Sequence, residues 1–210
     1  MQAEHGRSVE TAAALLAVRP MRPEEAGLVA RYFHAASDAD LERMGVVERA
    51  RLPPEKDWTR QLDAALRQAP ETAGSAYFAW VVDGLPVGFS SLKNLRPGEG
   101  ADLHLHMWSA AHRGQGHGAI LFCLTVQEAF ERFRLRQAFC EPKATNPMPN
   151  RLLTKVGFPL IATYVGASSE LSRTTQLNRY DIRSEVADAY LRKVQAHRSA
   201  PRHSPAPESI

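Results

Sequence analysis

Residues 101–158, ADLHLHMWSAAHRGQGHGAILFCLTVQEAFERFRLRQAFCEPKATNPMPNRLLTKVGF, decide the fold of this chain. Side chains alternate between polar and apolar over 102–108, which is typical of a strand. A glycine-rich turn follows at 113–118, and apolar residues then recur at helical spacing to about residue 133. A short apolar strand at 137–141, a proline-rich loop and a Gly-Phe pair complete the stretch. We therefore expect strand, turn, helix and strand in that order.

The glycine-rich turn predicts a ligand. Gly114, Gly116 and Gly118 occupy alternate positions behind Arg113, so no Cβ blocks an approach to the backbone. Because a helix begins directly afterwards, its unpaired N–H groups and positive dipole end face the turn. This arrangement favours a phosphate or pyrophosphate, and the Arg113 guanidinium would add positive charge.

The same residues carry a resemblance to a known family. Residues 113–118 (RGQGHG) fit the R/Q-x-x-G-x-G/A signature of the GNAT acyltransferases, which bind acetyl-CoA. Asn146 and the later residues 155–158 (KVGF) are similar to the family's segment from an asparagine to Gly-Phe. The pair Glu141-Pro142 looks most like the RimJ/RimL-type branch. The first hundred residues match the family only by their layout.

The resemblance implies an N-acetyltransferase that uses acetyl-CoA and carries over the cofactor contacts. It places them at the end of the strand, in the turn and after the second strand of the stretch. They are Met107, Trp108, Ser109, Arg113, Gly114, Gln115, Gly116, His117, Gly118, Ala119, Asn146 and Asn150. A backbone N–H at the strand end would stabilise the oxyanion.

The general base stays open between three side chains and water. Glu141 ends a strand where the ribosomal-protein alanine acetyltransferases keep a catalytic glutamate. His104 and His106 share one strand face, and imidazole titrates nearest to neutral pH. The family often has a tyrosine as general acid, but the register from Asn146 puts Leu153 there. Tyr164, another group or solvent would have to replace it.

Other functions fit parts of this pattern. A chain with leucine at the acid position could be a non-catalytic CoA-binding or regulatory module. Residues 114–119 also satisfy the dinucleotide fingerprint G-x-G-x-x-G/A, with Glu141 near the position of its ribose-binding acid. The gap at 109–113 between strand and turn, and the short chain after Glu141, argue against that reading. His104 and His106 lack a third metal ligand, so we expect no metal site.

The remaining chain predicts one α+β domain over residues 13–197. We expect strands at 14–19, 77–82, 87–92, 160–165 and 175–182, with a hairpin turn at Asp83-Gly84. Helices are expected near 23–36, 41–50, 57–68, 150–156 and 184–197. Together these give a single mixed, mostly antiparallel sheet of about six to seven strands flanked by helices. Residues 1–12 should be frayed and the tail 198–210 disordered.

The long helix should bury one face. The side chains expected inward are Ala119, Phe122, Cys123, Val126, Phe130 and Phe133, and those expected toward water are Thr125, Gln127, Glu128, Glu131 and Arg132. Cys123 and Cys140 are then buried free thiols, because two cysteines make no disulfide framework.

Composition limits the partners. Among 210 residues, 44% are hydrophobic and 23% charged, and the net charge is only +3. This fits an anionic cofactor but not the dense basic surface of a nucleic-acid-binding protein. No signal peptide or apolar membrane span is present in the sequence, so we expect a cytoplasmic protein without a membrane partner. The expected acceptor is a small-molecule or peptide amine, and a homodimer stays open.

Overall fold

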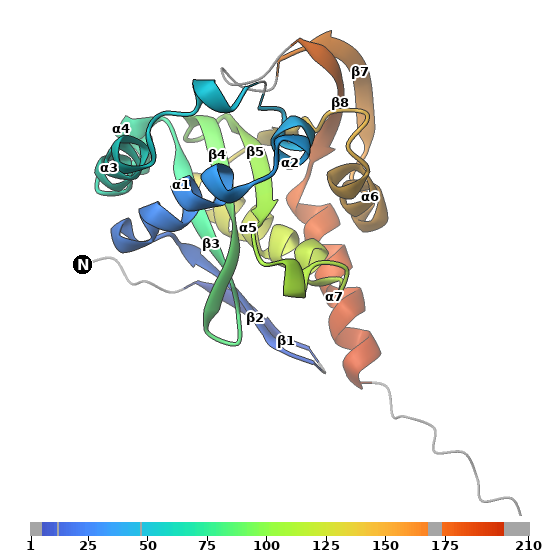
Figure 1. The fold of residues 1–210 in the computed structure, drawn as a ribbon. Coiled ribbons are helices and arrows are strands. Elements are labelled where there is room, and N and C mark those ends of the chain that lie inside the picture. The colour runs from blue at the N-terminus through green and yellow to red at the C-terminus, as the bar shows by residue number, and fades with distance from the viewer. Residues whose placement is uncertain (1–5, 12, 47, 168–173, 200–210) are drawn as a thin grey trace, which may run out of the picture.

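A computed structural model describes residues 6–11, 13–46, 48–167 and 174–199, and it confirms the mixed, mostly antiparallel sheet (Figure 1). The sheet has eight strands in the order β1-β2-β3-β4-β5-β6-β8-β7. The strands are Arg7–Glu10 (β1), Leu15–Pro20 (β2), Ala76–Val82 (β3), Leu85–Arg96 (β4), Gly100–Met107 (β5), Gln137–Cys140 (β6), Leu160–Gly166 (β7) and Thr175–Ile182 (β8).

The first strand corrects the expectation that the whole segment 1–12 is frayed. Residues Arg7–Glu10 pair antiparallel with β2, and the Val9 side chain is buried. Thr11 closes the turn, since its hydroxyl donates to the Ala14 carbonyl at 2.9 Å. The polar composition of the segment hid a strand that needs only one buried side chain and a neighbour to pair with. Residues 1–5 and 12 lie outside the described residues.

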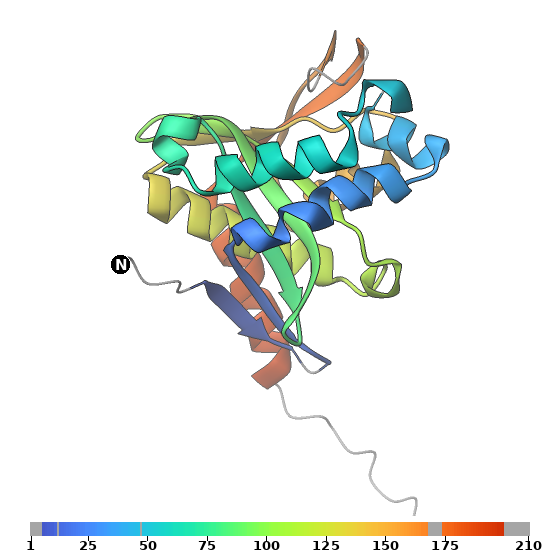
Figure 2. The ribbon, with the colours of Figure 1, turned by 60° about the vertical axis from the view of Figure 1, so that its left-hand side comes forward.

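Helices cover both faces of the sheet (Figures 1 and 2). Ala26–Ala35 (α1) and Glu55–Leu66 (α3) pack together on one face, while His117–Phe133 (α5) and Ser184–Ser199 (α7) pack together on the other. The shorter helices are Asp38–Met44 (α2), Pro70–Ala73 (α4) and Pro147–Val156 (α6), with 3-10 turns at Pro23–Glu25 (η1), Arg49–Arg51 (η2) and Ala110–His112 (η3). No helix in the described ranges is both long and apolar enough to cross a bilayer.

Several predicted boundaries move. Helix α2 begins before the expected residue 41, because the Ser37 side chain caps it by accepting from the Asp40 N–H. It ends at Gly45, whose φ of 92° stops the helix. The predicted hairpin at Asp83-Gly84 is confirmed, but β4 runs on to Arg96 and shortens the expected loop at 94–100. Helix α7 includes residues 198 and 199, which were predicted to belong to the disordered tail. Residues 200–210 lie outside the described residues.

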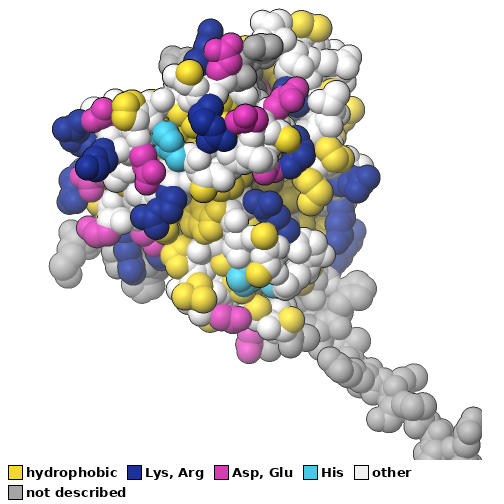
Figure 3. Space-filling view, viewed as in Figure 1, with side chains coloured by type: hydrophobic (Ala, Val, Ile, Leu, Met, Phe, Trp, Pro, Cys, Tyr) yellow, Lys and Arg dark blue, Asp and Glu magenta, His cyan; other side chains and the backbone are white. Residues whose placement is uncertain are grey.

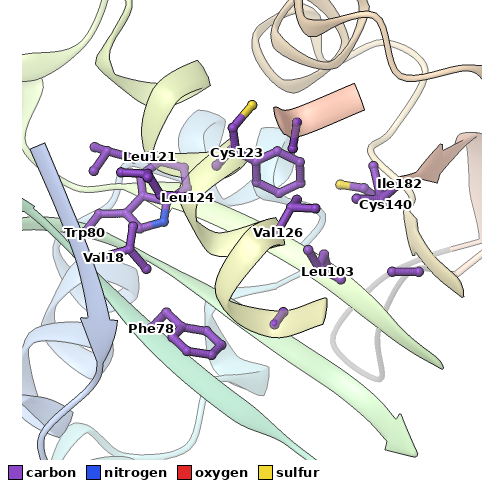
Figure 4. Close-up of a cluster of buried hydrophobic side chains, with 14 of the residues drawn as sticks. Val18, Phe78, Trp80, Leu103, Leu121, Cys123, Leu124, Val126, Cys140 and Ile182 are labelled. Carbon is purple, nitrogen blue, oxygen red and sulfur yellow. The ribbon is translucent and has the colours of Figure 1, made fainter. Parts of the chain in front are cut away.

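Helix α5 is buried on more sides than its sequence predicts. Thr125 and Glu128, expected to face water, are 0% and 8% exposed. The indole N–H of Trp80 donates to the Thr125 hydroxyl at 3.0 Å, and this hydroxyl donates to the Leu121 carbonyl. Figure 4 shows Trp80 beside Leu121 and Leu124 in this core. The extra burial arises because both the sheet and α7 pack against α5.

The strands β5 and β6 form the parallel pair of the described sheet, and their pairing is short. Three registered pairs join them, ending at Asp102 opposite Phe139. A single parallel pair within an antiparallel order is not the doubly wound sheet of a dinucleotide-binding fold, so that alternative is wrong. Beyond Asp102, β5 continues to Met107 without β6 beside it.

Candidate functional site

A cleft of about 980 Å³ opens where β5 and β6 separate. It is lined by β5 residues 103–107 from one side and by Cys140, Glu141 and Pro142 from the other. Alternation along β5 sends Leu105 and Met107 toward the α5 face and His104 and His106 toward the α1 face, so the cleft connects both faces. In Figure 3 apolar side chains are visible in a hollow on this side of the molecule, with Lys and Arg side chains around it.

The glycine-rich turn forms one end of the cleft. Gly114 and Gly116 have φ values of 77° and 82°, and a Cβ at either position would meet no protein atom within 4 Å. Gly116 is the N-cap of α5, so the unpaired N–H groups of the first turn of this helix lie beside it. Gly118 follows in the first turn of α5, where a Cβ would come within 3.3 Å of the Leu152 side chain. The turn is thus a bare, positively polarised backbone surface at the cleft.

The side chains around the turn mostly hold the turn itself. The Arg113 guanidinium donates twice to the Met107 carbonyl, at 2.9 and 2.7 Å, and so fixes the turn to the end of β5. The Gln115 side chain donates to the Ala111 carbonyl at 2.6 Å. Ser109 donates its N–H to the Val87 carbonyl, and its hydroxyl bonds His112.

His117 is the exception among these side chains. It is 5% exposed, and its Nδ1 has no hydrogen-bond partner within the described part of the chain. Burial lowers the pKa of His117, and the neighbouring His112 lowers it further. A neutral imidazole therefore sits behind the turn.

Helix α6 borders the cleft on the opposite side. Asn146 caps it, with its Oδ1 accepting from the Met148 N–H at 3.3 Å. The Nδ2 of Asn146 donates to the Arg43 carbonyl at 2.9 Å, and Lys143 Nζ donates to the Glu42 carbonyl at 2.8 Å. These two bonds tie the C-terminal end of α2 to the loop before α6. We call this link the α2 bridge.

Asn150 has a different environment from the one its sequence position predicts. Its Nδ2 donates to the carbonyls of Lys143 and Asn146, and its Oδ1 accepts from Asn178 and from the Tyr180 hydroxyl. It does not line the cleft. It holds the α6 loop against β8.

On the α1 face, the cleft has an aromatic wall formed by Tyr32, His106 and Trp108. The Tyr32 ring lies 5.7 Å from His106 and 6.4 Å from Trp108. His106 stacks on Phe89 at 4.8 Å.

Burial lowers the pKa of His106 to about 3, with a smaller contribution from His104. Burial, and then the charge of Lys93, lowers the pKa of His104. Burial raises the pKa of Tyr32, so its hydroxyl keeps its proton.

Glu141 lies at the end of β6, where the Arg179 guanidinium forms an ion pair with it. Burial, and then this carboxylate, raises the pKa of the nearby Tyr164 hydroxyl. Arg179 in turn lies 4.8 Å above the Phe139 ring and 5.2 Å above the Tyr164 ring. The carboxylate of Glu141 therefore reaches the cleft in a fixed orientation, with its charge compensated.

Leu153, the residue at the expected general-acid position, is 0% exposed within the hydrophobic core. No proton donor can act from there. Within the described ranges, no group of three His, Cys, Asp or Glu side chains gathers closely enough to hold a metal ion.

The structure brings most of the predicted site residues to one cleft. Those lining it are His104, His106, Met107, Trp108, Arg113, Gly114, Gly116, Gly118, Ala119, Glu141 and Asn146. Ser109, Gln115, His117 and Asn150 are not among the residues that line it. The sequence did not single out the contributions of α1, α2 and α6, which include Arg31, Tyr32, Asp40, Arg43, Arg151 and Lys155. The helix expected near 23–36 includes Tyr32, but its sequence does not separate the part that faces the cleft from the part that faces the core.

Solved structures with the same fold cover nearly the whole chain. RimJ of Mycobacterium smegmatis, in complex with CoA-disulfide, has a TM-score of 0.71 and 18% identity over 92% of this chain and 94% of that one. Ribosomal-protein-S5-alanine acetyltransferase of Vibrio fischeri has a TM-score of 0.67 and 16% identity, covering 85% and 97%. Spermidine N-acetyltransferase of Vibrio cholerae, in complex with CoA and spermine, has a TM-score of 0.65 and 13% identity, covering 82% and 97%.

By sequence, no curated protein matches the chain. The acetyltransferase (GNAT) domain family matches residues 16–159, which is more than half of the chain and includes the glycine-rich turn, the separated strands and α6. This match confirms the resemblance carried by residues 113–118. The chain belongs to the GNAT acetyltransferase family.

Proposed function

We propose that this protein is an N-acetyltransferase that moves an acetyl group from acetyl-CoA to a primary amine by direct attack in a ternary complex. The observation that carries the proposal is the continuous cleft. It runs from the bare backbone of the glycine-rich turn, through the gap between β5 and β6, to the aromatic wall on the α1 face. Two substrates can therefore enter from opposite faces of the sheet and meet inside it.

The residues present fit coenzyme A. The missing Cβ atoms at Gly114 and Gly116 leave open space where a diphosphate would contact the backbone. Arg151 and Lys155 of α6 line the cleft beside this turn and would supply charge to phosphate groups. Beyond Asp102, the edge of β5 that faces away from β4 pairs with no strand among the described residues, so its backbone groups can bond an extended pantetheine arm. Acetyl-CoA, when bound, would supply the acyl group as a thioester.

The chain's own contribution is positioning and charge stabilisation. A backbone N–H at the end of β5, near Met107, would donate to the developing oxyanion. Holding both reactants in one cleft removes the entropy cost of their encounter. His106, with its pKa near 3, stays neutral and is a weak proton acceptor. We infer that the amine loses its proton to water in the cleft, while Glu141 orients groups at the sheet opening.

The test replaces Gly116 with valine and compares it with Gly74→Val. Gly74 has a φ of 61° and equally open surroundings, but it caps α4 outside the cleft. Both variants should lose stability, by about 1–2 kcal/mol, because valine is strained at positive φ. Only Gly116→Val should lose affinity for CoA in calorimetry, by tenfold or more. Undiminished CoA affinity in a folded Gly116→Val protein would refute the site.

One observation favours a second function, a CoA-binding module without turnover. Leu153 is buried in the core, so the usual proton donor to the leaving thiolate is missing. Free thiol release from acetyl-CoA, measured across a panel of amines, separates the two functions. Release with any amine supports the enzyme. CoA binding without release from any amine supports the module.

A further inference from the structure

The acidic side chains of the cleft are already neutralised. Of the described residues that line it, Asp40 and Glu141 carry carboxylates. Asp40 accepts from the Ser37 hydroxyl at 2.6 Å and is paired with Arg43. Glu141 is paired with Arg179. Neither carboxylate is left to bind a further ammonium group of an acceptor.

Positive charge, in contrast, is abundant and partly unpaired. The cationic residues that line the cleft are Arg31, Arg43, Arg113, Lys143, Arg151 and Lys155. On the α1 face, Arg43 is paired and Lys143 belongs to the α2 bridge. Arg31 is exposed, and no other described residue offers it a hydrogen bond or an ion pair. Its guanidinium is therefore available to an anion.

The α1 side of the cleft carries mostly apolar and aromatic side chains. Leu28, Arg31, Tyr32 and Ala35 lie on one face of α1 and line the cleft together. Tyr32 stands against His106 and Trp108, as described above. This wall suits a ring or an alkyl chain, and Arg31 lies next to it along the helix.

We propose that the acceptor is a primary amine that also carries an anionic group, a carboxylate or a phosphate, which pairs with Arg31, and that polyamines are poor acceptors. This inference rests on the proposed acetyl transfer and names its substrate class. A second or third ammonium group would meet uncompensated cations without a free carboxylate. An anionic group would instead gain charge-assisted hydrogen bonds from the guanidinium. The same positive surroundings favour the neutral form of the attacking amine.

The experiment uses acceptor pairs that differ only in the anionic group. Acetyl transfer from acetyl-CoA is measured with 4-(aminomethyl)benzoate against benzylamine, with 2-aminoethyl phosphate against ethanolamine, and with spermidine. We expect kcat/KM for at least one anionic amine to exceed that of its neutral partner by about tenfold or more. The kcat/KM for spermidine should be lower than that of either member of this pair. The two pairs distinguish a carboxylate from a phosphate.

Two variants assign the effect to Arg31. Arg31→Gln should bring the ratio within the preferred pair close to one and leave CoA affinity unchanged. Arg60→Gln, which removes an exposed arginine paired with Asp57 on α3 outside the cleft, should keep the wild-type ratio. A preference for spermidine or for the neutral amines would overturn the proposal. An Arg31→Gln variant that keeps the wild-type ratio would also overturn it. So would an Arg31→Gln variant that loses CoA affinity by as much as it loses the preference for the anionic amine, because Arg31 would then bind the cofactor.

A binding measurement keeps the inference separate from the proposed function. Calorimetry of each amine against the protein saturated with CoA needs no turnover. Tighter binding of the anionic amines, without thiol release from any of them, would support the acceptor class and refute the enzyme. Equal binding of anionic, neutral and polycationic amines would refute the acceptor class, whatever the turnover.

Discussion

At the scale of single residues, His106 is the group whose titration most directly tests the structure. Burial lowers its pKa from 6.5 to about 3. Between pH 6.5 and 3, His106 is therefore protonated in the unfolded chain but neutral in the folded protein. The stability contributed by the neutral imidazole is complete above pH 6.5 and is lost as the pH falls toward 3, by at most about 1.4 kcal/mol per pH unit.

We predict that His106→Phe weakens this acid sensitivity, because phenylalanine can keep the stacking on Phe89 without taking up a proton. Urea unfolding at several pH values between 7 and 4.5 measures it. The unfolding free energy of the wild type should fall more steeply than that of the variant. Parallel curves, or an imidazole NMR signal of His106 that titrates near pH 6.5, would contradict the burial of this residue.

At the scale of elements, the α2 bridge links two segments that are far apart in the sequence. Asn146 serves both sides, because its Oδ1 caps α6 and its Nδ2 donates to the Arg43 carbonyl at the end of α2. Asn146→Asp keeps an acceptor for the cap but removes the donor. Asn146→Ala removes both and should also cost about 1 kcal/mol as a lost helix cap.

We predict that both variants increase amide hydrogen exchange in α2, while only Asn146→Ala also increases it in the first turn of α6. Exchange measured by mass spectrometry on peptides covering residues 38–46 and 146–152 separates the two effects. Unchanged protection of α2 in both variants would mean that Lys143, or packing alone, holds this helix.

At the scale of the whole molecule, α7 packs against α5, the helix that follows the glycine-rich turn, and so stabilises it. Leu191 is 4% exposed in the main core, and Gln127 of α5 donates to Asp188 of α7 at 2.6 Å. We predict that Leu191→Ala lowers the unfolding free energy by about 2–4 kcal/mol, through lost burial and the cavity left behind. Thermal or urea unfolding measures this.

Arg192→Ala is the matched control, because it alters the next residue on the exposed side of α7. It should change stability by less than about 0.5 kcal/mol. Similar losses in the two variants would show that α7 contributes through its helix alone and not through contact with α5.

The elements that the sequence predicts well are those whose signal is local. The hairpin turn at Asp83-Gly84 needs positive φ at both positions, and Gly157 ends α6 for the same reason. Strand β7 follows from a short apolar run with β-branched residues, whereas β8 is largely polar and buries only Leu177, Tyr180 and Ile182. In contrast, β1 has little local signal, because a short polar strand forms only when a neighbour supplies its hydrogen bonds.

Part of the candidate site can likewise be predicted from local sequence, and part of it depends on packing. The glycine-rich turn before α5 can be read from the order of residues, because φ values near 80° and a bare backbone depend on the glycines themselves. The other side of the cleft cannot. Arg31 and Tyr32 come from α1 and Lys155 from α6, and only packing brings them to the opening between β5 and β6.

By itself, then, the sequence determined the family signature and the backbone surface that would hold a diphosphate, since each depends on residues close together in the chain. Tertiary structure decided which charges remain available in the cleft. Glu141 meets Arg179 only in the folded chain, and Arg31 is left without such a partner among the described residues. Ion pairing across distant segments is set by packing, which no local pattern encodes.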